Sequence, residues 1–150
     1  MLTTPSTTRN ENWIEVLGLK RAEVPILIIG NNPIEMTSIF NVLVGIRSKS
    51  YLADVCFDVK DSFEIISTSK PKVILIDDNL VSDDIQKMLR VLKQNAKTRH
   101  IKIIVLKSSN WNYNVIDNVD DYILKDTINP DLLDRIIDKN LEPNDNQLVY

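Results

Sequence analysis

The sequence has little of several residue types on which common kinds of site depend. Among its 150 residues there are three glycines, one cysteine and one histidine. Because Cys56 is the only cysteine, the chain cannot form an internal disulfide. Gly18, Gly30 and Gly45 are too far apart for a glycine-rich phosphate loop. With His100 as the single histidine there is no Ser/His/Asp or Cys/His set for nucleophilic catalysis, so we expect no enzyme activity.

A strong excess of charge and a long apolar run are also lacking. The net charge of -3 gives no reason to expect nucleic acid or an acidic membrane as a partner. No apolar run approaches the roughly 20 residues of a membrane-spanning helix. The N-terminus is rich in Thr and Ser and has no signal-peptide core. We therefore expect a cytoplasmic protein without a membrane partner.

The chain has the composition and the patterning of one globular domain. Hydrophobic residues make up 43% of it and charged residues 26%. We expect an N-terminal extension over residues 1–23, partly disordered and with one short helix near Trp13. A domain over residues 24–140 and a C-terminal tail over residues 141–150 follow. The short tail favours a stand-alone domain.

Within residues 24–140, short apolar runs alternate with amphipathic segments. The runs over 25–29, 51–57, 101–106 and 120–124, and the run that ends at Asp77, are typical of buried strands. The amphipathic segments after them predict helices, the first opening at Asn32-Pro33 and the last at Asn129-Pro130. We expect Asp58 to cap a helix whose inner face carries Val59, Phe63 and Ile66. We expect Ser82 to cap the next helix, with an inner stripe of Ile85, Met88, Leu89 and Leu92. Strict alternation predicts an α/β fold with a doubly wound, five-stranded parallel sheet.

In such a sheet, ligands bind at the carboxyl ends of the strands. The residues there are Gly30-Asn31, Asp77, Lys107 and Lys125. Together with the segments 71–80 and 121–125, this pattern resembles the receiver domain of two-component response regulators. The resemblance covers about residues 24–140. It implies a flavodoxin-like sheet with strand order 2-1-3-4-5 and helices on both faces.

The resemblance also implies roles for four residues. Asp77 matches the phospho-acceptor of the family. Asn79 matches the residue whose backbone carbonyl joins the Mg²⁺ shell. Lys125 matches the lysine that pairs with the phosphoryl group, and Tyr122 matches the aromatic residue that changes rotamer on activation.

Three positions depart from the family pattern. Gly30-Asn31 replaces the acidic pair that holds Mg²⁺, Lys107 replaces a Ser or Thr, and Asp126 replaces a Pro. Because Mg²⁺ prefers carboxylate oxygens, we expect no metal and no cofactor at this site. We expect Lys107 and Lys125 to flank Asp77 and to neutralise its charge.

These departures favour a degenerate receiver, or pseudo-receiver, that acts by phosphorylation-independent protein–protein interaction. The alternative is a phospho-accepting response regulator with Asp77 as acceptor and a non-standard Mg²⁺ site that recruits Asp78. We expect the Asp78 side chain on the other side of the strand end, which disfavours that alternative. An enzyme or nucleotide-binding protein on a flavodoxin-like fold is the third hypothesis.

A pseudo-receiver needs a protein partner, such as a histidine kinase or a downstream regulator, or a second copy of itself as a homodimer. The segment from Lys107 to Lys125 is about one helical turn shorter than in typical relatives. It carries Trp111 and Tyr113, and aromatic residues at the centre of an interface contribute much of its binding energy. They are our candidate interface; the competing interpretation is that both rings pack on their own sheet. The helix near Trp13 is a second candidate surface.

Overall fold

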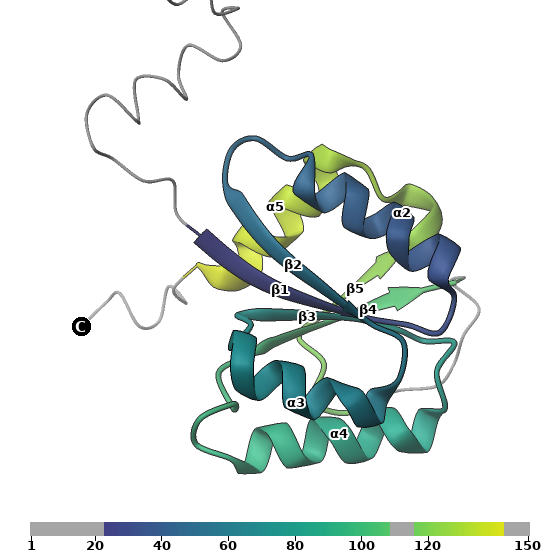
Figure 1. Ribbon diagram of the computed structural model, residues 1–150, viewed down its shortest axis with the longest axis vertical. Helices are drawn as coiled ribbons and strands as arrows, with labels where there is room; N and C mark the ends of the chain where they lie inside the picture. The colour runs from purple at the N-terminus through teal and green to yellow at the C-terminus, as the bar shows by residue number, and fades with distance from the viewer. Residues whose placement is uncertain (1–22, 109–115, 143–150) are drawn as a thin grey trace, which may run out of the picture.

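The computed structural model of the protein describes residues 23–108 and 116–142 (Figure 1). The predicted helix near Trp13 and the candidate interface residues Trp111 and Tyr113 lie outside the described residues, as does nearly all of the C-terminal tail. None of the helices in the described segments is long and apolar enough to cross a membrane.

Five strands form one parallel sheet in the order β2-β1-β3-β4-β5. The predicted fold class and strand order are confirmed. All four neighbouring pairs are parallel, and the pairing of β3 with β4 places Asp77 beside Leu106. The strands are β1 (Glu23–Ile29), β2 (Ser50–Cys56), β3 (Val73–Asp77), β4 (Lys102–Lys107) and β5 (Asp121–Leu124).

Three of the α-helices in the described residues begin where the sequence supplies a capping side chain. Asn32 and Asn129 each accept backbone N–H groups at the N-cap position, and each is followed by a proline in the first turn. Asp58 caps α3 in the same way. The helical segments are α2 (Pro33–Val44), α3 (Val59–Ser69), α4 (Ser82–Gln94), the short 3₁₀ helix η1 (Lys125–Thr127) and α5 (Pro130–Leu141).

Two apolar layers enclose the sheet. Helices α2 and α5 cover one face, and α3 and α4 cover the other (Figure 1). Every residue of β3 is buried, because this central strand has a helix layer on both sides. The predicted inner stripe of α4 is confirmed; its buried residues are Ile85, Met88, Leu89 and Leu92.

Helix α3 is rotated relative to the prediction from apolar spacing. We expected Phe63 on the inner face, but its ring is exposed. Ser62 is fully buried instead. Its hydroxyl is satisfied locally, since Oγ donates to the Val59 carbonyl at 2.5 Å. A small polar residue with a local partner therefore packs more closely on the sheet than the larger ring.

Strand β2 forms one edge of the sheet and alternates in exposure. Tyr51 and Cys56 are buried, whereas Leu52 and Asp54 are exposed. This edge of the sheet carries a mixed surface with one carboxylate near its middle.

A polar cluster joins the start of β2 to α5. The Asp134 carboxylate accepts hydrogen bonds from the hydroxyls of Tyr51, at 2.5 Å, and Ser48, at 2.9 Å. Lys49 Nζ lies 3.0 Å from Asp134 Oδ1 and 2.6 Å from Asp138 Oδ1. The cluster connects α5 to the β2 end of the sheet.

Candidate functional site

Asp77 ends the central strand and is fully buried. Its Oδ1 accepts the backbone N–H of Asn79 at 2.9 Å. Lys125 Nζ donates to both carboxylate oxygens, at 3.2 Å to Oδ1 and 3.1 Å to Oδ2. The structure therefore brings together three residues that the resemblance singled out, with the backbone amide of Asn79 facing Asp77.

Lys125 has a second carboxylate partner. Its Nζ donates to Glu35 Oε1 at 3.1 Å, so oxygen atoms of two carboxylates surround the ammonium group. Burial opposes the charge of Lys125, but the hydrogen bonds to Asp77 and Glu35 outweigh it and raise the pKa of the ammonium group. Lys125 is thus held in its charged form between two carboxylates.

Sequence reasoning missed Glu35. This residue lies in the first turn of α2, six residues after the end of β1 at Ile29. Because β1 pairs with β3, a side chain at the start of α2 can reach the end of β3. The one sequence signal for Glu35 was a carboxylate in the first turn of the helix that starts at Asn32-Pro33. A carboxylate at this place is ordinarily explained by its favourable interaction with the helix dipole, so it did not indicate a site.

At Gly30, where the resemblance implies a metal-binding carboxylate, the Met36 side chain occupies the space that a side chain would take. Gly30 is buried, and a Cβ atom there would overlap the sulfur of Met36 and lie 2.9 Å from its Cγ and Cε atoms. Met36 is itself fully buried, and Asn31 is exposed. Among the described residues, no group of three or more His, Cys, Asp or Glu side chains could hold a metal ion. The Mg²⁺ of the receiver family does not fit these residues.

Lys107 lies away from the position that we predicted. Its ammonium group is 5.4 Å from the centre of the Tyr122 ring, a cation–π contact, and the predicted role beside Asp77 is wrong. The reason is strand geometry: Leu106 pairs with Asp77, so the next residue points to the opposite face of the sheet. Tyr122, the expected switch aromatic, is 39% exposed in this arrangement.

Ser108 supplies a hydroxyl that the sequence reading also missed. Its Oγ lies 3.0 Å from Asp78 Oδ1 and 3.1 Å from Asn79 Oδ1. The Asp78 carboxylate therefore packs with the residue after β4, next to the Asp77 site. We expected no hydroxyl at the end of β4 because Lys107 replaces the Ser or Thr of the family, and we did not consider the next residue, Ser108.

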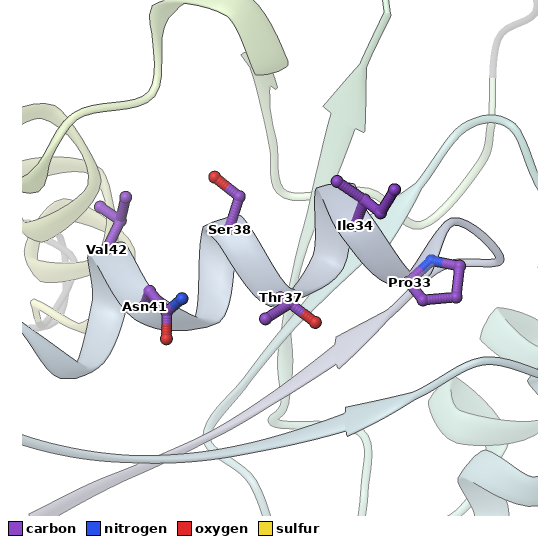
Figure 2. Close-up of a pocket in the computed structure, with 6 residues that line it drawn as sticks. All are labelled: Pro33, Ile34, Thr37, Ser38, Asn41 and Val42. Atoms are coloured by element: carbon purple, nitrogen blue, oxygen red, sulfur yellow. The ribbon is translucent and has the colours of Figure 1, made fainter.

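A shallow pocket lies on the outer side of α2, at the same helix start as Glu35 (Figure 2). Ile34 is its most prominent apolar residue and is 83% exposed. The pocket is lined by Pro33, Ile34, Thr37, Ser38, Asn41 and Val42.

Comparison with solved structures places the fold among receiver domains. The chemotaxis response regulator CheY4 of Vibrio cholerae is 12% identical, with a TM-score of 0.65 over 80% of this chain and 100% of that one. The receiver domain of a sensor histidine kinase from Pseudomonas aeruginosa, with a magnesium ion coordinated in its active-site cleft, is 21% identical. Its TM-score is 0.66, over 79% of this chain and 97% of that one.

A third similar structure is the receiver domain of a DNA-binding response regulator from Colwellia psychrerythraea. It is 20% identical and has a TM-score of 0.66, over 80% of this chain and 99% of that one. No protein-family model matches the sequence, and no curated protein matches it. The resemblance stated from the sequence is confirmed at the level of the fold.

Proposed function

We propose that the protein is a non-enzymatic signalling module of the receiver type, which acts by phosphorylation-independent contact with protein partners. One observation carries this proposal: the place of the metal-binding carboxylate is Gly30, and the buried thioether of Met36 fills the adjoining space. The fold supports a receiver-like role, and the missing carboxylate at Gly30 supports its independence from phosphorylation.

The chemistry of phosphoryl transfer explains why this position matters. Metal ions neutralise the charge that develops as a phosphoryl group moves to its acceptor. Here the cation beside Asp77 is Lys125, a single positive charge that Asp77 and Glu35 share. Two carboxylates already offset this charge, which leaves little of it to stabilise an incoming phosphoryl group, so Asp77 is a poor acceptor.

The second candidate is a phospho-accepting response regulator. The retained contact between Asp77 and Lys125 favours it, as does the magnesium ion in the similar receiver domain of the Pseudomonas histidine kinase. Under this alternative, Mg²⁺ would need oxygen ligands that Gly30 does not supply.

The partner of such a module would be a histidine kinase, a downstream regulator or a second copy of the chain, in the cytoplasm. Trp111 and Tyr113 stay our candidate interface residues. Alanine substitutions at both positions, checked for folding by circular dichroism, should abolish capture of the partner in pull-down. Capture that survives the double substitution would place the interface elsewhere.

The decisive experiment is incubation of the whole chain with acetyl phosphate and Mg²⁺, followed by intact mass measurement. The cyanobacterial phytochrome response regulator RcpA, for which a phosphorylated structure is known, serves as the positive control, and Asp77→Asn identifies any modification of Asp77. We expect no mass gain of one phosphoryl group on this chain while the control is modified. A gain that depends on Mg²⁺ and disappears in Asp77→Asn would establish the phospho-accepting alternative.

A further inference from the structure

We propose that the ammonium group of Lys125 is the resident cation of the Asp77 site, and that Glu35 is its second carboxylate ligand. Lys125 would do with one positive charge what a divalent ion does in a metal-bound site, namely hold two carboxylates from different elements together. This inference deepens the proposed function, because a site with its own cation has no need of a metal ion.

The first argument is the number of carboxylate oxygen atoms around one ammonium group. Lys125 Nζ lies 3.1 to 3.2 Å from Asp77 Oδ1, Asp77 Oδ2 and Glu35 Oε1. Asp77 comes from β3, Glu35 from α2 and Lys125 from the end of β5. One ammonium group thus bridges three elements that are far apart in the sequence.

The second argument is that the three side chains differ in their exposure to solvent. The Asp77 side chain is 0% exposed, that of Lys125 is 9% exposed and that of Glu35 is 41% exposed. The inner carboxylate is out of reach of water, and the outer one closes the site toward solvent. Glu35 therefore takes the position at which an external ligand would have to approach Lys125.

The third argument is the balance of charge. The two carboxylates carry two negative charges, of which the ammonium group neutralises one; if the ammonium group were removed, a hard divalent cation could neutralise both. The vacated position would lie between Asp77 and Glu35, whereas the space next to Gly30 is filled by Met36. Removal of Lys125 should therefore uncover a cation site that the wild-type chain does not offer.

The test is thermal unfolding of the whole chain with MnCl2, MgCl2 or EDTA. Lys125→Met keeps most of the side-chain volume and removes the charge. We expect its melting temperature to rise with metal concentration, because a ligand that binds only the folded state stabilises it. Wild type, and the matched control Lys107→Met, whose ammonium group lies over the Tyr122 ring, should show no such rise.

The double variant Lys125→Met/Glu35→Gln assigns the second ligand, and it should lose the response to metal. The proposal is overturned if folded Lys125→Met does not respond, if the wild type responds equally, or if the double variant keeps the full response. The phosphodonor experiment uses a separate readout, so failure of one proposal is distinguishable from failure of the other.

A second measurement decides the matter if Lys125→Met does not fold. The NH3⁺ group of Lys125 can be followed by ¹H–¹⁵N NMR, with Lys125→Arg used to assign its signal. Glu35→Gln should accelerate hydrogen exchange of this group several-fold, whereas Glu64→Gln, which removes the same charge from α3, should leave it unchanged. Equal exchange in both variants would show that Glu35 is not a ligand of Lys125.

Discussion

Asp77 and Lys125 are a buried ion pair in which each partner compensates the charge of the other. In Asp77→Ala, Lys125 would keep only the half-exposed Glu35 as its anionic partner. We expect the free energy of unfolding to fall by about 3 kcal/mol, since breaking a buried pair leaves a poorly compensated charge. Urea denaturation measures the change. Glu35→Gln, on the solvent side of Lys125, should lower the free energy of unfolding by less than about 1 kcal/mol. Equal stability of Asp77→Ala and wild type would mean that the Asp77–Lys125 pair does not stabilise the fold.

Gly30 and Met36 should behave as a coupled pair of residues. Gly30→Leu places an apolar side chain where the Met36 thioether lies, so we expect it to destabilise the protein by about 1–3 kcal/mol. Met36→Ala alone should cost about 2–4 kcal/mol because it leaves a cavity. In the double variant the leucine side chain can enter that cavity, so the combined loss should be at least about 1 kcal/mol smaller than the sum. Chemical denaturation of all four proteins gives this coupling, and strict additivity would contradict the steric explanation.

At the scale of elements, the Asp134 cluster connects α5 to the β2 end of the sheet. Tyr51→Phe removes the hydroxyl that donates to Asp134 and keeps the ring. We expect a loss of about 1–2 kcal/mol, as for a hydrogen bond to a charged acceptor. Amide hydrogen exchange should speed up more in α5 than in α4. A uniform increase in both helices would indicate a general loss of stability and not release of α5.

The same cluster should make stability depend on pH. Burial acts to raise the pKa of the Asp134 carboxyl, but hydrogen bonds from Tyr51, Lys49 and Ser48 outweigh it and lower the pKa. Asp134 therefore stabilises the folded state above its ordinary pKa of about 4, and this contribution is lost as the pH falls through the lower folded value. The difference in unfolding free energy between wild type and Asp134→Asn should be constant from about pH 7 to pH 5 and shrink below about pH 4. A difference that stays constant to pH 2.5 would contradict the lowered pKa.

Helices and strands were predictable where the apolar pattern of the sequence matches the burial of the residues in the fold. The continuous apolar run that ends at Asp77 predicted β3, and Asn-Pro pairs predicted the starts of α2 and α5. Helix α4 begins at Ser82, with Val81 at the N-cap, so the prediction that Ser82 caps it was off by one residue. The apolar spacing placed Phe63 inward in α3, because hydrophobicity alone cannot show that a small hydroxyl with a local acceptor fits better.

The candidate site was less predictable, because it depends on side-chain direction at strand ends. Asp77 and Lys125 were found from position and resemblance, and they do meet. Lys107 was misplaced because the pairing register of β4 was unknown. Glu35 comes close to Lys125 only through the tertiary fold, 90 residues apart in the sequence, and no local pattern records that contact.

At the scale of the whole molecule, the two apolar layers share the strands between them. Alternate residues of β3 belong to opposite layers; Leu75 packs toward α2 and α5, whereas Ile76 packs toward α3 and α4. The site lies at the carboxyl end of this shared strand. The backbone of Asp77 therefore lies at the end of a strand that both layers cover.

The edge strand β2 also has a consequence for solubility. Its outward backbone groups have no strand partner within residues 23–108 and 116–142, and an unpaired edge is a template for aggregation. Asp54 is the only charged residue in the strand and is exposed near its middle. Asp54→Val would turn Tyr51–Cys56 into an uncharged run of high β-propensity. Light scattering of concentrated samples should then show association for Asp54→Val but not for Asp54→Lys, which marks Asp54 as a gatekeeper against polymerisation.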